Sequence, residues 1–345
     1  MKVLCISSVG LPTPAPGYSG LENISAWTAI ELAKRGHDVQ LACSMDSPHK
    51  KLKSLGVKTI PTCFSALTPI PELESYQILK ARLSKEKVGE FDFIMDDSHL
   101  SMSILFEKEF GRREGQVFLR RLHDDQGYNS PPPIEYPSFI TPSHGLAESV
   151  SSRHHWFVSQ VVHHGIPVQE YIPGNGGDRL LYVGRIQSLK GVDVAVRVAQ
   201  ATGLGLDIVG PTTHLQGDPY VKSITKLCDG EQIKIHGEVS HEQKVEFYRN
   251  ALCTLMPSRF QEPFGLVSTE SQACGTPMIV SANGGLPETI QHGRTGFVAW
   301  NFAEFVEYVE LVRKLSRMEC RQWAEKFSVE VMVNRILELV KKAPW

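Results

Sequence analysis

The sequence lacks the patterns that mark several common protein classes. Its seven cysteines are an odd number, scattered along 345 residues without a Cys-x-x-Cys pair. This usage fits free thiols in a reducing cytosol better than a disulfide framework. No apolar run approaches the length of a membrane-spanning helix. The formal net charge is −2, so the chain has no basic field of the kind that binds nucleic acid. We therefore expect a soluble, cytoplasmic protein without a nucleic-acid partner.

Metal and cofactor signatures are also scarce. Two histidine pairs, His154–His155 and His163–His164, are not completed by a cysteine or a carboxylate at a known ligand spacing. The sequence contains no Asp-x-Asp triplet either. We expect no bound metal and no cofactor.

Short β-branched runs instead alternate with helical segments through the N-terminal half. Such alternation predicts a parallel sheet with helices on both faces. The expected strands are Val3–Ser7, Val39–Cys43, Phe91–Met95, Val117–His123 and Phe139–Pro142. The expected helices are Glu22–Arg35, Glu72–Lys87, His99–Phe110 and Gly145–Ser152.

The alternation starts again after Pro167–Asp178, a stretch rich in Pro, Gly and Asn that marks a domain boundary. Ligands of open α/β sheets bind at the carboxyl ends of the strands. A cleft between two such sheets is therefore the expected active site. The expected strands are Arg179–Gly184, Leu206–Val209, Ile233–His236, Cys253–Met256 and Pro277–Val280. The expected helices are Val192–Ala201, Glu242–Ala251, Leu266–Ala273 and, beyond the second sheet, Val329–Lys342.

Arg185 and Lys190 lie on the loop between an expected strand and an expected helix. Arginine offers a planar fork, lysine a point charge and the helix N-terminus an aligned dipole, so this loop suits a diphosphate. Two solvated loop cations are the alternative, because lysine and arginine are common on loops.

Two carboxylates flank the start of a later helix. Glu262 lies in the preceding loop, and Glu270 lies about a turn and a half into the helix. Free backbone N–H groups at Gly265, Leu266 and Val267 can bind phosphate oxygens, and the carboxylates can accept hydrogen bonds from sugar hydroxyls. The alternative is one glutamate favoured by the helix dipole and one exposed helical glutamate, which leaves their pairing with a glycine unexplained.

Glu262 and Glu270 match the E-x7-E motif of the retaining glycosyltransferases of family GT4, and the chain resembles that family over roughly residues 178–300. Several ordered motifs at proper spacing are stronger evidence than any single one. The further stretches that resemble the family are Val183-Gly184-Arg185 with Lys190-Gly191, Ala273-Cys274-Gly275-Thr276-Pro277, Asn283-Gly284-Gly285-Leu286-Pro287-Glu288 and Gly293-Arg294-Thr295-Gly296-Phe297.

The resemblance implies the GT-B fold, an α/β architecture of two Rossmann-like doubly wound domains that face each other across a cleft. Residues 1–165 would form an acceptor-side domain, joined by a crossing helix at 329–345, and residues 166–328 the domain that binds the nucleotide-sugar donor. The implied activity is that of a retaining, metal-independent glycosyltransferase. It would move a hexose from a UDP- or GDP-sugar to an acceptor hydroxyl. The missing Asp-x-Asp triplet argues against the metal-dependent GT-A type.

The resemblance also implies roles for single residues. Arg185 and Lys190 would neutralise the leaving diphosphate, Glu270 would hold the ribose, and Glu262 would contact the hydroxyls of the transferred sugar. Phe264, Gly265 and Leu266 would lie against sugar and phosphate through their backbone. The other expected donor-binding positions are Gly20, Gly184 and Val267.

Acceptor-side residues are expected in the N-terminal half. Gly17 and Tyr18 lie in a loop at Pro16–Glu22 that resembles the Gly-rich loop of the family, and a flexible turn is the alternative. His123, followed by Asp124, resembles the histidine that faces the transferred sugar at the end of a cleft strand. A strand-end histidine capped by a neighbouring carboxylate is the alternative. The expected catalytic set is His123, Glu262, Arg185 and Lys190.

Other interpretations stay open. The same fold can serve a sugar-nucleotide epimerase or a non-catalytic nucleotide-sugar-binding protein. Basic residues on the expected helix Glu72–Lys87 leave peripheral contact with anionic lipid open, although the interspersed glutamates favour a solvated face. The donor base, the acceptor class and the oligomeric state have no readable pattern in the sequence.

Overall fold

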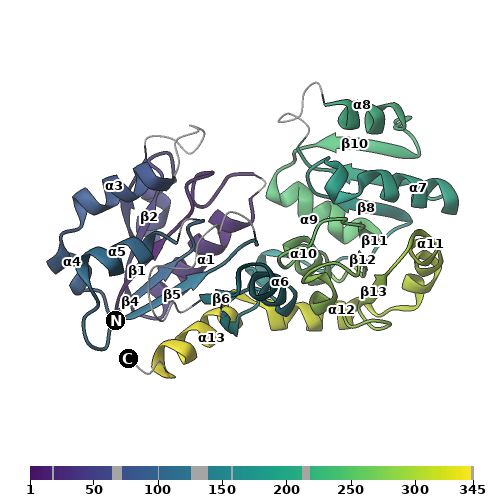
Figure 1. Ribbon diagram of the computed structural model, residues 1–345. Coiled ribbons are helices and arrows are strands. Elements are labelled where there is room, and N and C mark those ends of the chain that lie inside the picture. The colour runs from purple at the N-terminus through teal and green to yellow at the C-terminus, as the bar shows by residue number, and fades with distance from the viewer. Residues whose placement is uncertain are drawn as a thin grey trace. The chain divides into compact units, whose positions relative to one another are not determined.

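The computed structural model describes residues 1–17, 19–63, 72–99, 101–125, 139–156, 158–211 and 218–342 (Figure 1). The chain divides into two compact units. The N-terminal unit comprises Met1–Gly165 together with Val329–Trp345, and the C-terminal unit comprises Ile166–Ser328. Each unit is built on one sheet whose described strand pairs are all parallel. The predicted α/β architecture with two doubly wound sheets is therefore confirmed.

The sheet of the N-terminal unit has the order β3-β2-β1-β4-β5-β6-β7 among the described strands. The chain moves outward from β1 in one direction and then restarts beside β1 with β4. This reversal creates a switch point between the carboxyl ends of β1 and β4, where open α/β sheets bind ligands. The strands are β1 (Lys2–Ile6), β2 (Asp38–Cys43), β3 (Val57–Pro61), β4 (Phe93–Asp96), β5 (Val117–Arg121), β6 (Phe139–Thr141) and β7 (Val158–Val161).

Helices cover both faces of this sheet. Side chains of α3, α4 and α5 pack on one face against buried residues of β1, β4 and β5, such as Ile6 and Phe118. Helix α1 packs on β1, β2 and β3, and α13 packs on α1. The helices are α1 (Leu21–Lys34), α2 (His49–Ser54), α3 (Glu72–Arg82), α4 (Lys85–Gly89), α5 (Met102–Phe110), α6 (His144–His154) and α13 (Val329–Lys342).

Some element boundaries differ from those predicted. The single helix expected at Glu72–Lys87 is two helices, because the side chain of Ser84 accepts a hydrogen bond from the backbone N–H of Lys87 (3.4 Å) and starts α4 as its N-cap. Strand β5 ends at Arg121, so His123 lies two residues beyond the strand and not at its end. Short elements that periodicity did not indicate, such as α2, β3 and β7, complete the sheet's outer parts.

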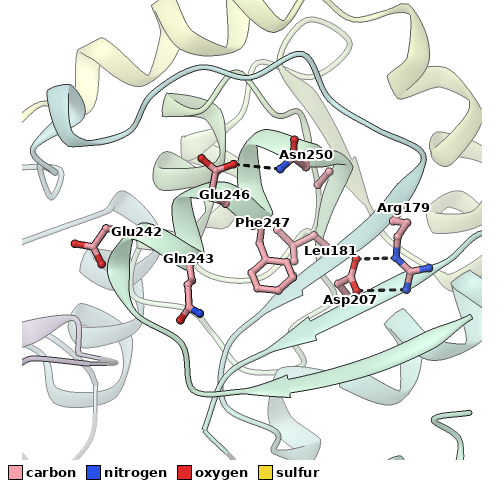
Figure 2. A pocket seen from close by; sticks show the side chains of 9 residues that line it. Arg179, Leu181, Asp207, Glu242, Gln243, Glu246, Phe247 and Asn250 are labelled. Atoms are coloured by element: carbon pink, nitrogen blue, oxygen red, sulfur yellow. Dashed lines mark hydrogen bonds and ion pairs between the residues drawn. The ribbon is translucent and has the colours of Figure 1, made fainter. Parts of the chain in front are cut away.

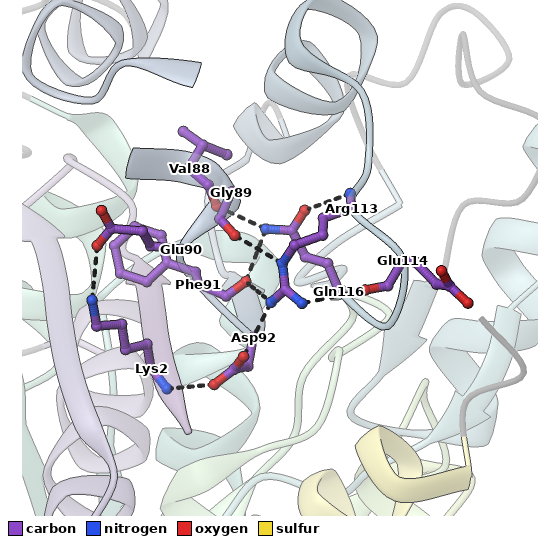
Figure 3. Close-up of polar contacts among 9 residues, drawn as sticks. All are labelled: Lys2, Val88, Gly89, Glu90, Phe91, Asp92, Arg113, Glu114 and Gln116. Carbon is purple, nitrogen blue, oxygen red and sulfur yellow. Dashed lines mark hydrogen bonds and ion pairs between the residues drawn. The ribbon is translucent and has the colours of Figure 1, made fainter. Parts of the chain in front are cut away.

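Polar contacts at the amino ends of the strands close the opposite edge of this sheet (Figure 3). The backbone N–H of Lys2 donates to Asp92 Oδ2 (2.8 Å). The buried amide of Gln116 donates through Nε2 to the backbone carbonyls of Val88 (2.8 Å) and Phe91 (2.9 Å). Buried polar groups at this edge are therefore hydrogen-bonded, as stability requires.

The sheet of the C-terminal unit has the order β10-β9-β8-β11-β12-β13 among the described strands. Its switch point lies between β8 and β11, since the chain returns to the side of β8 after β10. The strands are β8 (Arg179–Val183), β9 (Leu206–Val209), β10 (Ile233–Gly237), β11 (Ala251–Met256), β12 (Met278–Ser281) and β13 (Gly296–Ala299).

The helices of the C-terminal unit also lie on both faces of their sheet. Apolar residues of α7, α8 and α11 form one continuous core with β8, β9 and β11. Helix α9 packs on β8 and β11, and α10 packs on α12. The helices are α7 (Val192–Thr202), α8 (Pro219–Lys226), α9 (His241–Asn250), α10 (Leu266–Ala273), α11 (Phe302–Leu311) and α12 (Arg317–Ala324). Helices α8, α11 and α12 and strand β13 were not among the predicted elements.

Two further findings bear on the sequence expectations. All seven cysteines lie among the described residues and are free thiols, most of them buried, as their scattered spacing predicted. Over the ranges that the structure describes, none of the helices combines the length and apolar character needed to cross a membrane.

Candidate functional site

The loop after β8 presents the predicted phosphate-binding cations. Arg185 is exposed, and no hydrogen bond joins its side chain to the rest of the described chain. Lys190 ends a short 3₁₀ helix at Ser188–Lys190. Gly191, which follows, has φ = 72°, and a Cβ there would lie 2.0 Å from the carbonyl oxygen of Pro257. Only glycine therefore allows the two loops to approach this closely.

Several hydrogen bonds tie this loop to the segment after β11. The carbonyl of Leu189 accepts from the backbone N–H groups of Arg259 (2.8 Å) and Phe260 (3.2 Å). The Arg259 guanidinium also donates to both carboxylate oxygens of Asp193 (2.8 and 2.6 Å). The two loops are thus held as one platform at the carboxyl ends of β8 and β11, the switch point of this sheet.

Lys190 and Glu262, which were predicted separately, are direct partners on this platform. Lys190 Nζ lies 2.6 Å from Glu262 Oε1, and the same oxygen accepts from Ser258 Oγ (2.9 Å). The exposed fraction of the Glu262 side chain is 6%, and that of Lys190 is 14%. A charge-assisted bond this buried fixes both side chains in place.

The Asn283–Glu288 motif holds the backbone of Glu262. Gly285 N–H donates to the carbonyl oxygen of Glu262 (2.7 Å). Gly284 has φ = 60°, and a Cβ there would lie 2.3 Å from that same oxygen. The two glycines therefore serve a close backbone approach that positions the carboxylate.

Helix α10 begins directly after this loop with an open N-terminus. Gly265 is its N-cap, with φ = 104° and no side-chain hydrogen bond to the first turn. The backbone N–H groups of Leu266 and Val267 therefore remain available as donors within the described chain, beside the positive end of the helix dipole. The side chain of Phe264 is buried against Phe327, with ring centroids 5.7 Å apart.

Glu270 lies inside α10 in a cage of protein donors that sequence reasoning missed. Its Oε1 accepts from Tyr171 Oη (2.9 Å) and Lys244 Nζ (3.0 Å). Its Oε2 accepts from Tyr248 Oη (2.8 Å) and lies 2.9 Å from Lys244 Nζ. Two carboxylate oxygens offer about four acceptor positions, and these donors take all of them. A contact between Glu270 and a ribose therefore requires one donor to move.

Burial, reinforced by the charge of Glu270, raises the pKa of Tyr171 and of Tyr248 well above the ordinary value of tyrosine. Both hydroxyls thus stay protonated and donate. Lys244 and Tyr248 are four residues apart on α9 and share one helix face, a spacing that the sequence does show. Tyr171 comes from the start of the unit, 99 positions from Glu270, and no local pattern links the two.

A pocket of about 560 Å³ lies on a different part of the C-terminal unit (Figure 2). Its lining residues come from α9, β8, β9 and the first position of β11. None of the predicted donor-binding residues belongs to its lining. The lining residues are Arg179, Leu181, Asp207, Glu242, Gln243, Glu246, Phe247, Asn250 and Ala251.

In the N-terminal unit, Glu22 organises the predicted Gly-rich loop. Its Oε1 accepts from Ser8 Oγ (2.6 Å) and from the backbone N–H of Leu11 (3.2 Å), and its Oε2 accepts from Ser19 Oγ (2.5 Å). Gly20 is the N-cap of α1. Glu22 was not predicted to act, although it stands at the helix start where a carboxylate favours the dipole.

Two other acceptor-side positions of this loop can be placed only in part. Gly17 is exposed. Tyr18 lies outside the described residues.

His123 lies just past β5 with only 8% of its side chain exposed. Its Nε2 is 3.5 Å from Asp97 Oδ1, and its ring stacks on His164 with centroids 5.6 Å apart. Burial lowers the pKa of His123 below the ordinary value, and Asp97 opposes that shift. Asp124, beside it, lies 3.6 Å from His99 Nδ1.

The histidine pairs take part in local packing. His154 Nε2 hydrogen-bonds the carbonyl of Asp125 (2.8 Å), and His163 meets His144 edge-on. His164 stacks on His123. Within the described ranges, no group of three or more His, Cys, Asp or Glu residues is arranged to hold a metal ion.

Residues 170–327 match the model of the family described as glycosyl transferases group 1. A relative from Catenulispora acidiphila, D-inositol 3-phosphate glycosyltransferase 1, is 32% identical over 215 residues, which are 53% of this chain. The match spans 51% of that relative, so the chain aligns with about half of its length.

Solved structures match almost the whole chain. AviGT4, a glycosyltransferase involved in avilamycin A biosynthesis, superposes with a TM-score of 0.75 at 21% identity, covering 99% of this chain and 97% of its own. Anabaena Alr3699/HepE, solved in complex with UDP and glucose, has a TM-score of 0.74 at 17% identity, covering 99% of each chain. At these identities the likeness concerns the fold, and it confirms the predicted GT-B architecture.

Proposed function

We propose, from the premise that this chain belongs to the group 1 glycosyltransferases, of the GT4 type with the GT-B fold, that it transfers a hexose from a nucleotide-diphosphate sugar to an acceptor hydroxyl. The donor is a UDP- or GDP-sugar. The reaction retains the configuration of the sugar and uses no metal ion. The C-terminal unit holds the donor, and the N-terminal unit supplies His123 and the acceptor side.

The observation that carries this proposal is the platform formed by the loops after β8 and β11. It joins Lys190 and Glu262 in a buried ion pair (2.6 Å) next to the open N-terminus of α10. Cations and unpaired helix amides suit a diphosphate, and a fixed carboxylate suits sugar hydroxyls. A nucleotide sugar carries both chemical groups in one molecule.

The same groups account for the chemistry. As the bond between the anomeric carbon and the phosphate oxygen breaks, negative charge grows on the leaving diphosphate. Arg185, Lys190 and the α10 amides stabilise that charge in place of a metal. The acceptor oxygen bonds to the anomeric carbon on the same face, and its proton passes to the departing phosphate. No base on the opposite face is needed, so an α-linked donor yields an α-linked product.

The complex of HepE with UDP and glucose supports UDP as the nucleotide. The name of the Catenulispora relative includes an inositol phosphate. The acceptor proposed for the present chain is a molecule with a nucleophilic hydroxyl.

A thermal-shift panel of UDP-, GDP- and ADP-sugars tests the donor. A ligand at 100 times its Kd stabilises the native state by about 2.7 kcal/mol, which raises Tm measurably. We expect a shift with UDP- or GDP-hexoses, and failure of every nucleotide sugar to shift Tm would contradict the assignment of the donor site.

Product analysis tests the reaction. Proton NMR of the anomeric coupling in the first-formed product should show an α-linkage from an α-linked donor. A β-linked product would overturn the retaining assignment. A new sugar nucleotide formed without acceptor would indicate an epimerase instead, and binding without turnover on any acceptor would indicate a non-catalytic binding protein.

A further inference from the structure

A second charged cluster lies in the N-terminal unit, at the carboxyl ends of β4 and β5. Asp97 and Arg121 are fully buried, and His123 is 8% exposed. Asp97 Oδ1 stands 3.5 Å from Arg121 Nη1 and 3.5 Å from His123 Nε2. The other carboxylate oxygen, Oδ2, accepts from Ser25 Oγ on α1 (2.9 Å). One carboxylate thus stands between a guanidinium and an imidazole.

The bonding of Arg121 is unusual for a buried ion. None of its three guanidinium nitrogens hydrogen-bonds to any residue that the structure describes. Arg120, the preceding residue on β5, points to the other face and donates through Nη2 to Glu107 (2.5 Å). A buried charge without hydrogen bonds costs several kcal/mol, so stability does not explain Arg121. Groups of this kind concentrate at functional sites.

The charges of the cluster decide the protonation of His123. Arg121 and Asp97 cancel each other, and a protonated imidazole would add a positive charge that nothing in the cluster balances. Other titratable groups face His123 as well. His164 stacks on its ring, and an electrostatic interaction with His99 lowers the pKa of His123. Both are imidazoles, and protonation of either would disfavour a second cation. His123 is therefore neutral near neutral pH.

A neutral imidazole carries one N–H, and its neighbour selects which nitrogen holds the proton. An ionised carboxylate only accepts hydrogen bonds. Because Nε2 faces Asp97 Oδ1, the proton belongs on Nε2. Nδ1 then carries a lone pair, and it bonds to no residue within the described chain. Hydrogen bonds of this type are long in empty sites and shorten when substrate binds.

We propose that Asp97, held by Arg121 and Ser25, is a positioning residue that keeps His123 as the Nε2–H tautomer, so that Nδ1 accepts a hydrogen bond from a hydroxyl of the sugar substrate. The stacked ring of His164 fixes the plane of the imidazole. The inference rests on the proposed function and sharpens it, because it excludes His123 as a proton donor to the leaving group. It also requires a substrate with a free hydroxyl at that position.

The direct test is nitrogen NMR on the full-length chain labelled with ¹⁵N-histidine, with His123 assigned from the spectrum of His123→Ala. At neutral pH the wild type should show a protonated Nε2 and an unprotonated Nδ1. A proton on Nδ1, or on both nitrogens, would overturn the proposal. This measurement needs no turnover, so it stands apart from the test of the proposed function.

Asp97→Asn should change the tautomer, because the new amide can donate to Nε2 and drive the proton to Nδ1. Because the His123 tautomer would then no longer suit the substrate, kcat should fall about 10- to 100-fold, with little change in donor affinity. The matched control is Glu107→Gln, which removes the carboxylate partner of Arg120 on the other face of β5. It should leave both the tautomer and kcat unchanged.

Two results would contradict this account. One is an Asp97→Asn enzyme that keeps the wild-type tautomer, and the other is a control that lowers kcat as much as Asp97→Asn does. If Asp97→Asn does not fold, Ser25→Ala, which removes one support of the carboxylate, should populate a mixture of tautomers. A single unchanged tautomer in that variant would equally refute the role of Asp97.

Discussion

The two units each bury a carboxylate at the centre of a charged cluster, and the two carboxylates differ in how many hydrogen bonds they accept. In the C-terminal unit, Glu270 receives hydrogen bonds from two tyrosines and a lysine, all between 2.8 and 3.0 Å. In the N-terminal unit, the Asp97 carboxylate accepts one hydrogen bond from the described residues, that of Ser25, and stands 3.5 Å from both Arg121 and His123.

This difference indicates two different roles for buried charge. A carboxylate whose acceptor positions are all used by protein donors ties α9 and α10 to the first residues of its unit, and it contributes to stability. A carboxylate that relies on charge balance contributes little to stability but can set the state of a neighbour that meets substrate. The predictions below test whether the two clusters divide in this way.

Glu270→Ala should have the largest effect. It leaves Lys244, whose side chain is 26% exposed, without its counter-ion and leaves two buried tyrosine hydroxyls without their acceptor. Each buried hydroxyl left without its acceptor costs about 1–3 kcal/mol, so urea unfolding should show a destabilisation of roughly 2–6 kcal/mol. A loss below about 1 kcal/mol would mean that the cage is not structural and would remove the contrast between the two clusters.

The double variant Arg121→Met with Asp97→Asn should behave in the opposite way. Replacing a buried ion pair by apolar or neutral groups of similar volume is often neutral or stabilising by about 1–4 kcal/mol. We expect Tm to stay the same or rise while turnover falls. Circular dichroism melts and initial rates give both quantities, and a strong drop in Tm would show that this cluster, too, serves stability.

The tyrosines of the Glu270 cage should make stability depend on alkaline pH. Their pKa is higher in the folded than in the unfolded state, so the stability they contribute is fully present below about pH 10, the unfolded value. It is lost as pH rises above that value toward the folded pKa, because the unfolded chain releases these protons first. In that window each tyrosine should lower the free energy of unfolding by about 1.4 kcal/mol per pH unit.

Tyr248→Phe tests this dependence on pH. Unfolding free energies measured from pH 9 to pH 11 should fall less steeply in the variant than in the wild type. Equal slopes would show that the hydroxyl is not held protonated by the cage.

Arg185→Ala should weaken binding of the nucleotide diphosphate about 10-fold or more, since a charge-assisted hydrogen bond contributes roughly 1.5–3 kcal/mol. Lys190→Ala should weaken it further and also destabilise the fold, because Glu262 then stays buried without its cation. Calorimetric titration with UDP and GDP measures both. Unchanged affinity in the two variants would remove the phosphate-binding assignment of this loop.

Chelation should have the smallest effect. In the proposed mechanism, Arg185, Lys190 and the α10 amides supply the positive charge that a metal would otherwise bring to the leaving group, so turnover should survive exhaustive treatment with EDTA. Turnover that EDTA abolishes and manganese restores would contradict this mechanism. It would also show that the charged clusters of the protein are not sufficient by themselves.

Local sequence spacing by itself determined the positions of many strands and of two candidate site residues. The alternation of β-branched runs and amphipathic segments located the central strands of both sheets, such as β1 and β8, because period and propensity are properties of neighbouring residues. The same holds for Glu262 and Glu270, whose eight-residue separation around a glycine N-cap follows from the helix itself. Ser84, a residue type that favours helix N-caps, is also a local signal for the break between α3 and α4. The helical periodicity of Glu72–Lys87 nevertheless predicted a single helix.

Only the tertiary structure decided which groups meet. Lys190 reaches Glu262 across 72 positions, and Tyr171 reaches Glu270 across 99. Asp97 meets His123 because β4 and β5 are adjacent in the sheet. No periodic pattern encodes such pairs, since they depend on strand order and on where each loop returns after its strand. The physical reason is that a sequence repeats its hydrophobic spacing locally, whereas a buried charge is balanced by whatever side chain the completed fold places beside it.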